Sequence, residues 1–285
     1  MTKRDFTLAN GMTFPALGEG TWYLGEKRSA YAAEKESLIQ GARHGLTLID
    51  TAEMYGSGKA EILVGDVLKA FSREELTIVS KVYPHNAGIP KIYKSCEASL
   101  KRLGTDYLDV YLLHWRGSIP LSETVEGMEK LVKEGKIKCW GVSNFDISDM
   151  EELWEVPGGN RCQVNQVLYH AGSRGIEYDL LPWMRARHVA LMAYCPLAQG
   201  GTLRRGLFQN TVLREMAQHK NCTVSQILLA FAIRDGHTVA IPRTSSAAHA
   251  IENAKAAEIF LTEEEIAAID RVFPAPKHKT GLDIM

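Results

Sequence analysis

The chain has 285 residues, enough for two average domains or for one large α/β domain. Its 33 basic and 34 acidic residues are interspersed and give a formal net charge of -1, which leaves no electrostatic footprint for nucleic acid or an anionic membrane. Any anion must therefore be bound locally. Because no linker-like or low-complexity stretch divides the chain, we expect a single domain over residues 1–285.

The start of the chain and the cysteines indicate a compartment. Residues 1–6 lack the apolar core of a signal peptide, and no apolar run is long enough to cross a bilayer. We therefore expect a cytoplasmic protein without a membrane partner. The five cysteines lack the C-x-x-C spacing of a metal or redox site, so they are expected to be small buried hydrophobic residues, and no metal is predicted.

The first predicted element is a β-hairpin, because residues 6–14 alternate in polarity around Asn10-Gly11. A hairpin at this position suits a lid over one end of a barrel. A short glycine-containing strand follows at 17–20, where a ligand or another backbone can approach closely. This stretch is not a dinucleotide-binding fingerprint, because the third glycine of that motif would fall on Tyr23.

Helix-period segments then alternate with short apolar strands. Eight such units at this length favour a closed (β/α)₈ TIM barrel, with a doubly wound open sheet as the structural alternative. The strands are expected at 17–20, 47–49, 76–80, 108–113, 139–142, 163–166, 190–194 and 239–241. The helices are expected at 31–45, 59–71, 90–103, 121–135, 146–155, 177–188, 209–235 with a break near Cys222, and 245–257. A last helix is predicted to begin at Thr262, before a short C-terminal tail.

Ionisable residues follow three consecutive predicted strands. Asp50, Lys81 and His114 come at these strand ends, and Tyr55 lies on the loop after Asp50. The carboxyl ends of the strands of a parallel barrel build its active site. Each residue also has an ordinary explanation: a turn cap, a strand-end charge, a hydrogen-bonded core histidine or an exposed loop aromatic. Their coincidence at one rim favours a functional site.

Together these four groups suit proton transfer. A tyrosine has a reference pKa of about 10, so it exchanges protons efficiently near neutrality only beside a group that favours its anion. The ammonium of Lys81 can supply that bias, and the carboxylate of Asp50 can keep Lys81 charged and in place. His114 can then donate a hydrogen bond that orients a substrate oxygen.

Short motifs specific in combination lie along the whole chain. They are Gly20-Thr21-Trp22, Asp50-Thr51-Ala52-Glu53-Met54-Tyr55-Gly56, Ser80-Lys81-Val82, Leu112-Leu113-His114-Trp115, Gly141-Val142-Ser143-Asn144-Phe145, Asn165-Gln166, Tyr194-Cys195-Pro196-Leu197 and Ile241-Pro242-Arg243. With these motifs the sequence resembles the aldo-keto reductase family, NADPH-dependent carbonyl reductases built on a (β/α)₈ barrel, and the resemblance covers essentially the whole chain. It implies that Asp50, Tyr55, Lys81 and His114 are the catalytic tetrad, with hydride passing from the nicotinamide to the carbonyl carbon while Tyr55 protonates the oxygen.

Within the family the chain looks most like bacterial members that reduce methylglyoxal and other small aldehydes. The resemblance thus implies a small-molecule carbonyl substrate. The stretches that indicate this subgroup are Gly56-Ser57-Gly58-Lys59-Ala60-Glu61, Tyr83-Pro84, Trp115-Arg116-Gly117-Ser118 and Gly172-Ser173-Arg174-Gly175-Ile176-Glu177-Tyr178.

The resemblance also implies a set of cofactor contacts. Ser143, Asn144 and Gln166 match positions that hydrogen-bond the nicotinamide carboxamide, and Tyr194 matches the aromatic residue that stacks on the ring; rim polarity and barrel-core filling are the alternatives. The loop 198–206 looks like the segment that folds over the pyrophosphate, although its two arginines can instead be solvated surface. The other positions expected near the cofactor are Gly20, Thr21, Trp22, Pro196, Leu197, Gln199, Gly200, Ile241 and Pro242.

The last strand carries a physical signal for an anion. Arg243 ends it, and the hydroxyls of Thr244 and Ser245 precede a predicted helix whose free N–H groups attract anions. In the family this fits the 2′-phosphate of NADP. Where the family often has a second arginine this chain has His249, only partly charged near neutrality, so NADH is a possible weaker alternative to NADPH. The positions expected to face the adenine are Glu252 and Asn253.

The resemblance also implies that the substrate mouth is lined by Trp22, Tyr83, His114 and Trp115, for which packing between loops is the alternative. The tail beyond Phe273 is short compared with mammalian relatives, whose longer tail walls the pocket. We therefore expect a shallow, open pocket that favours small or flexible aldehydes, in a monomeric enzyme.

Two rival functions stay open. A barrel of this family also serves as the nucleotide-sensing cytoplasmic subunit of a potassium channel, and the lack of a tetramerisation or docking extension favours the enzyme. Barrels also place Schiff-base lysines at strand ends, which makes Lys81 a candidate aldolase nucleophile. In that case Arg243 and its neighbours have no role unless a phosphorylated ligand binds.

Overall fold

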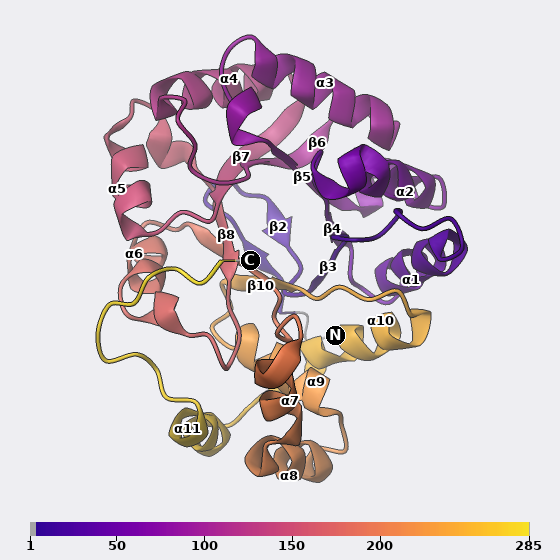
Figure 1. Ribbon diagram of the computed structural model, residues 1–285, viewed down its shortest axis with the longest axis vertical. Helices are drawn as coiled ribbons and strands as arrows, with labels where there is room; N and C mark the ends of the chain where they lie inside the picture. The colour runs from indigo at the N-terminus through magenta and orange to yellow at the C-terminus, as the bar shows by residue number, and fades with distance from the viewer. Residues whose placement is uncertain (1–3, 285) are drawn as a thin grey trace.

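The computed structural model describes residues 4–284, and its centre is an eight-stranded parallel sheet curved into a barrel (Figure 1). Neighbours in the sheet are also neighbours in strand order along the chain, and all of these pairs are parallel. The strands are β3 (Gly18–Gly20), β4 (Leu48–Asp50), β5 (Thr77–Val82), β6 (Leu108–Leu113), β7 (Ile137–Ser143), β8 (Val164–Leu168), β9 (Ala190–Tyr194) and β10 (Thr238–Ile241).

Backbone contacts between the first and last strands close this barrel. Leu17 forms a parallel bridge with Ala240, whose N–H donates to the carbonyl of Ala16 at 2.9 Å. Further along the seam, the N–H of Gly20 donates to the carbonyl of Pro242 at 3.1 Å. The predicted (β/α)₈ barrel is confirmed, and the open sheet is wrong.

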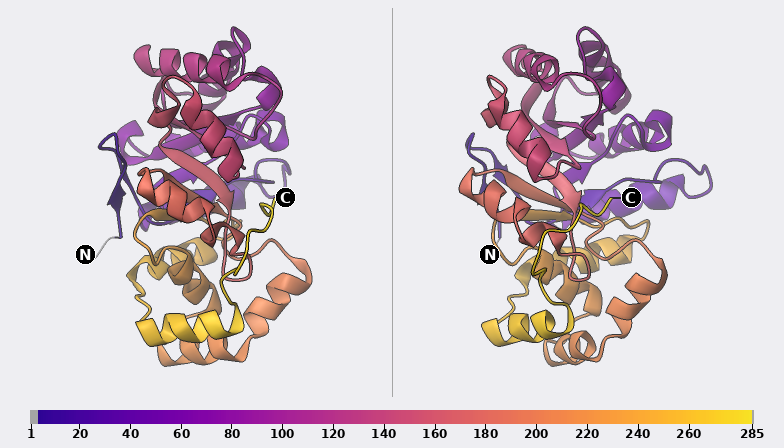
Figure 2. Two further views of the ribbon diagram at one scale, coloured as in Figure 1. Left: turned by 90° about the vertical axis from the view of Figure 1, so that its left-hand side faces the viewer. Right: turned by 60° about the vertical axis from the view of Figure 1, so that its left-hand side comes forward.

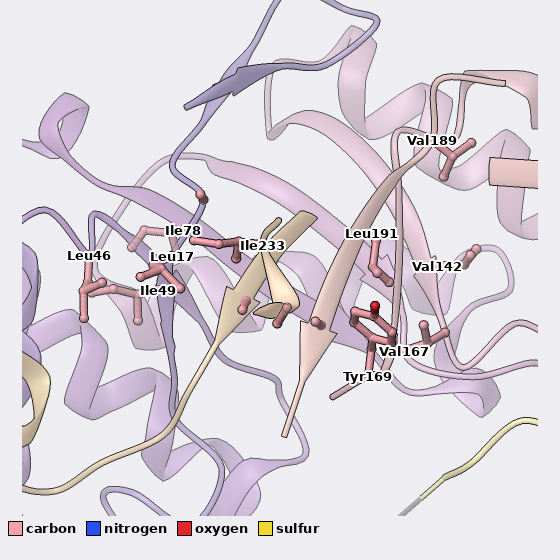
Figure 3. Packing of buried hydrophobic residues seen from close by; sticks show 14 of the residues in the cluster. Leu17, Leu46, Ile49, Ile78, Val142, Val167, Tyr169, Val189, Leu191 and Ile233 are labelled. Atoms are coloured by element: carbon pink, nitrogen blue, oxygen red, sulfur yellow. The ribbon is translucent and has the colours of Figure 1, made fainter. Parts of the chain in front are cut away.

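Helices surround the barrel and cover the outward side chains of its strands (Figures 1 and 2). Figure 3 shows part of this outer layer, where Ile49, Ile78 and Leu191 belong to one buried cluster. The helices are α1 (Tyr31–Arg43), α2 (Lys59–Leu68), α3 (Lys91–Leu103), α4 (Leu121–Lys133), α5 (Ile147–Glu155), α6 (Leu180–Ala186), α7 (Gly201–Gln209), α8 (Thr211–His219), α9 (Val224–Ala232), α10 (Ala247–Ala254) and α11 (Glu263–Val272).

An antiparallel hairpin of β1 (Phe6–Thr7) and β2 (Thr13–Phe14) closes the amino end of the barrel. Phe6 and Phe14 are buried in one cluster with the inward side chains of the strands. The N–H of Asn10 donates to the side chain of Gln163, which directly precedes β8, at 3.1 Å. The hairpin lid is confirmed, and it lies at the opposite end from the carboxyl termini of the strands (Figure 2).

Of two predictions about the segments after β9, one needs correction and one is confirmed. Residues 198–206, expected to be a loop, include the first part of α7, in which Leu207 is buried while Leu203 is exposed. The helix expected at 209–235 with a break near Cys222 is interrupted there, since α8 ends at His219 and α9 begins at Val224. Thr223 separates them because it forms a capping box, with its hydroxyl accepting from the Gln226 N–H at 3.3 Å and its own N–H donating to the Gln226 side chain at 2.9 Å.

Three of the five cysteines are packed in the interior, as expected. Cys96, Cys139 and Cys162 are buried, while Cys195 and Cys222 are half-buried. Within residues 4–284 we find no helix with the length and apolar character needed to cross a membrane.

Candidate active site

The predicted ionisable side chains point to the inside of the barrel because of their positions along the strands. Successive residues of a strand point to opposite faces of the sheet. In β4, Leu48 belongs to the inner cluster and Ile49 to the outer one, so Asp50 faces inward again. The same alternation points Lys81 of β5 inward, and His114 follows the last residue of β6. The three side chains thus lie at one mouth.

Lys81 is the centre of a buried hydrogen-bond network. Its ammonium donates to Asp50 Oδ2 at 2.7 Å, to the carbonyl of Thr51 at 2.9 Å and to the hydroxyl of Tyr55 at 3.0 Å. The side chains of Lys81 and Asp50 are 0% and 3% exposed. The Gln166 amide donates to the other oxygen of Asp50 at 2.7 Å. The structure therefore brings acid, amine and phenol into contact.

A tight turn holds Tyr55 over this network. Tyr55 begins the short helix η1 (Tyr55–Gly58), and Gly56, Ser57 and Gly58 all have positive φ angles, of 56°, 55° and 87°. Such left-handed backbone is routine for glycine and costly for serine, so surrounding structure must stabilise it. The Tyr55 ring meets the His114 ring edge-on, with ring centres 5.7 Å apart.

Burial decides the protonation of these groups. It raises the pKa of Asp50 and lowers the pKa of Lys81, in each case opposed by the charge of the partner. Burial, followed by the charge of Asp50, raises the pKa of Tyr55 well above its usual value. This direction is opposite to the bias expected from Lys81 alone, because the buried phenol loses solvation as an anion. Tyr55 therefore keeps its proton, which is the state required of a general acid.

His114 is neutral for a related reason. Burial, with the charge of Lys81 second, lowers the pKa of His114 to about 2. Its Nδ1 is buried and has no hydrogen-bond partner among the described residues. A neutral imidazole can donate one hydrogen bond without exchanging charge, which suits the orientation of a polar oxygen better than proton transfer.

On the opposite side of the mouth, polar groups from β7, β8 and β9 are linked. The Tyr194 hydroxyl donates to Asn144 Oδ1 at 2.9 Å, while the Asn144 amide donates to the carbonyl of His114 at 3.1 Å. The Ser143 hydroxyl donates to the carbonyl of Gln166 at 2.9 Å. Asn144 has a φ of 57°, in the left-handed region that asparagine adopts more readily than most residues other than glycine.

A cavity of about 150 Å³ joins the two sides, and no residue of the tail beyond Phe273 lines it. Met54 and Cys195 also line this cavity; both belong to the motifs that carry the resemblance, but the sequence assigned neither of them a role. Lys81 lies buried beneath it. The predicted site residues that line the cavity are Gly20, Thr21, Trp22, Asp50, Tyr55, His114, Trp115, Ser143, Asn144, Gln166, Tyr194, Ile241 and Arg243.

The other predicted contacts lie outside this cavity. Tyr83 packs its ring perpendicular to that of Trp115, with ring centres 5.8 Å apart. Glu252 accepts a hydrogen bond from the Thr223 hydroxyl at 2.7 Å, and Asn253 is buried. The remaining predicted residues outside the cavity are Pro196, Leu197, Gln199, Gly200, Pro242, Thr244, Ser245 and His249.

The candidate anion site lies where β10 runs into α10. Arg243 is exposed at the cavity edge, and α10 begins four residues later. Ser246 caps the helix by accepting from the His249 N–H at 3.4 Å. A guanidinium next to a helix N-terminus is a suitable environment for a phosphate group.

The carboxyl end of this closed parallel barrel holds the buried amine of Lys81 and the carboxylate of Asp50 beneath the protonated phenol of Tyr55. Such an arrangement is typical of an enzyme site for proton transfer. Residues 16–273 match the model of the aldo/keto reductase family. The chain belongs to the aldo/keto reductase family, a family of oxidoreductases.

Full-length relatives agree with this assignment. The chain is 52% identical over 285 residues to methylglyoxal reductase YeaE of Escherichia coli, covering 100% of both chains. It is 34% identical over 280 residues to glyoxal reductase of Bacillus subtilis, covering 96% of each. It is also similar to the crystal structure of an aldo/keto reductase from Klebsiella pneumoniae in complex with NADP and acetate, with a TM-score of 0.96, 51% identity and 100% of both chains covered.

Proposed function

We propose that the protein catalyses the NADPH-dependent reduction of small aldehydes and 2-oxoaldehydes, such as methylglyoxal, to alcohols. The observation that carries the proposal is the 3.0 Å hydrogen bond from Lys81 to the Tyr55 hydroxyl, at the floor of a cavity large enough for a small carbonyl compound. The similarity to a methylglyoxal reductase and a glyoxal reductase over nearly the whole chain supports the substrate class.

The donor groups of the cavity fit a dinucleotide phosphate. Ser143, Asn144 and Gln166 offer amide and hydroxyl groups on one wall, and Tyr194 offers an aromatic face. Arg243 supplies a guanidinium for a phosphate at the outer end. NADPH, when bound, supplies the hydride. A structure of a 51% identical aldo/keto reductase in complex with NADP supports this choice of cofactor.

The residues of the chain itself manage the proton. The Tyr55 hydroxyl, protonated in the resting site, gives its proton to the carbonyl oxygen of the substrate. The ammonium of Lys81, fixed by Asp50, stabilises the phenolate that Tyr55 then becomes. The neutral imidazole of His114 donates a hydrogen bond that holds the same oxygen in place.

The geometry disfavours a Schiff-base aldolase. A Lys ammonium has three donor hydrogens, and Lys81 directs hydrogen bonds to three acceptors at 2.7, 2.9 and 3.0 Å. Its amine is fully buried beneath the cavity rather than exposed to it. A nucleophilic lysine needs a lone pair and access to the substrate carbonyl, and this arrangement provides neither.

The experiment that tests the proposal follows the absorbance of NADPH and of NADH with carbonyl compounds from methylglyoxal to aromatic aldehydes and ketones. We expect NADPH oxidation to be fastest with small aldehydes and 2-oxoaldehydes. Borohydride treatment in the presence of each carbonyl compound is the matched control for aldolase chemistry. Tight NADPH binding without turnover of any compound would instead support a nucleotide sensor.

A further inference from the structure

A second buried carboxylate lies behind the strand that carries Lys81. Glu61 is in the first turn of α2, its side chain is fully buried, and it does not line the active-site cavity. Its Oε1 accepts a hydrogen bond from the Ser80 hydroxyl at 2.6 Å, and its Oε2 accepts one from Arg102 Nε at 2.5 Å. Ser80 directly precedes Lys81 and points to the outer face of the barrel because side chains alternate along β5.

Three parts of the fold that position the site meet at this carboxylate. The turn η1, which carries Tyr55, continues directly into α2, so Glu61 lies one helical turn beyond it. Ser80 ties Glu61 to β5, and Arg102 ties it to α3. The guanidinium also packs against the turn itself, since a Cβ on Gly58 would lie 2.6 Å from Arg102 Cδ.

We propose that Glu61 is a positioning residue for the reduction, an inference that rests on the proposed function. Glu61 holds the turn of Tyr55 against the strand of Lys81, so that phenol and amine remain within hydrogen-bond distance. Its negative charge also stabilises the charged form of Lys81 from the outer side of the sheet, opposite to Asp50.

Electrostatics agrees with this geometry. The charges of Asp50 and of Glu61 both raise the pKa of Lys81 against the lowering by burial. The titratable groups around Lys81 are therefore Asp50, Tyr55, Glu61 and His114, and Arg102 lies behind Glu61. Loss of the Glu61 charge lowers the pKa of Lys81, so the ammonium that holds Tyr55 is lost at a lower pH.

The test is the substitution Glu61→Gln, which keeps the size of the side chain and removes its charge. With methylglyoxal and NADPH, we expect kcat to fall about tenfold, KM to stay within about twofold, and the alkaline limb of the kcat profile to move to lower pH. The readouts are steady-state kinetics across pH and the melting temperature.

A matched control is available at the other end of the barrel. Asp109 of β6 is also buried, and it accepts hydrogen bonds from Arg73 at 2.7 Å and from the Ile78 N–H at 2.8 Å. We expect Asp109→Asn to lower the melting temperature while kcat and the alkaline limb remain those of the wild type. Equal effects of the two substitutions on kcat and on the pH profile would show that Glu61 contributes only to folding and would overturn the inference.

A second variant, Ser80→Ala, removes the link to β5 and leaves the charge of Glu61 in place. We expect a smaller fall in kcat with no shift of the alkaline limb. This variant decides the question if Glu61→Gln does not fold, and a wild-type kcat in Ser80→Ala would then overturn the inference. A wild-type protein that reduces no carbonyl compound would instead overturn the proposed function, and the inference with it.

Discussion

A lysine side chain that is 0% exposed needs compensation for its lost hydration, and Lys81 obtains it from groups that are themselves functional. Burying an ammonium is costly unless it is paired and hydrogen-bonded. Asp50 supplies the charge, while Thr51 and Tyr55 supply the remaining acceptors. The phenol of Tyr55 is therefore one of the groups that stabilise the buried ammonium, and this contact fixes the position of its hydroxyl.

At the outer end of the cavity, Arg243 provides a test of cofactor selection. Because its guanidinium is exposed at the cavity edge near the start of α10, we expect Arg243→Ala to weaken NADPH binding at least about tenfold and NADH binding much less. Dissociation constants from protein fluorescence titration check this. Equal losses for the two cofactors would mean that the phosphate is bound elsewhere.

The site residues differ in how far the sequence could predict them. Asp50, Lys81 and His114 were predictable because each comes at the end of an apolar run in the sequence, and the carboxyl ends of barrel strands meet at one rim. Gln166 lines the cavity, and its amide also donates to Asp50 across the barrel, a contact that the sequence did not predict. That contact joins residues 116 positions apart and depends on how side chains meet inside the barrel, which no local pattern encodes. Met54 likewise lines the cavity only because of the turn that follows it.

At the level of elements, a buried carboxyl group, that of Glu19, lies where β3 packs against α1. Glu19 lies on β3 with its side chain fully buried, and a Cβ on Gly41 of α1 would lie 2.3 Å from its Oε1. Its Oε2 has no hydrogen-bond partner among the described residues, and burial raises the pKa of Glu19 well above its usual value. The helix thus approaches the strand closely only because residue 41 is a glycine.

This carboxyl group should make stability depend on pH. The folded protein keeps the proton while the unfolded chain releases it near its ordinary pKa, so stability is full below that pKa and is lost as pH rises toward the folded value, by about 1.4 kcal/mol per pH unit. Glu19→Gln cannot ionise. We therefore expect it to be more stable than the wild type at pH 8 and to differ little at pH 4, as measured by urea denaturation. An unchanged slope of stability against pH would contradict a neutral Glu19.

The order and type of most elements followed from periodicity, because buried parallel strands form short apolar runs between amphipathic helices. The exceptions follow β9. There, α7 was missed because Gly200 and Gly201 suggested an irregular loop, although Leu207 is buried as in a packed helix. The break predicted near Cys222 is present, and the capping box of Thr223 explains why a new helix begins directly after it.

At the scale of the whole molecule, the two ends of the barrel have separate tasks. The hairpin packs Phe14, which is 0% exposed, into the amino end, while Asp50, Lys81 and His114 lie at or close to the carboxyl ends of their strands. We expect Phe14→Ala to cost about 3–5 kcal/mol of unfolding free energy and to leave kcat and KM within about twofold of the wild type. Chemical denaturation and steady-state kinetics at a temperature where the variant remains folded check both parts. A large change in KM with little loss of stability would contradict this separation.

On the proposed mechanism Tyr55, held by Lys81, is the proton donor for carbonyl reduction. The most direct measurement is turnover of methylglyoxal by Tyr55→Phe, with NADPH binding followed by fluorescence in the same preparation. We expect kcat to fall by about 10²–10⁴-fold while the dissociation constant of NADPH stays within about twofold, because only the proton donor is lost. Turnover at the wild-type rate would contradict the account.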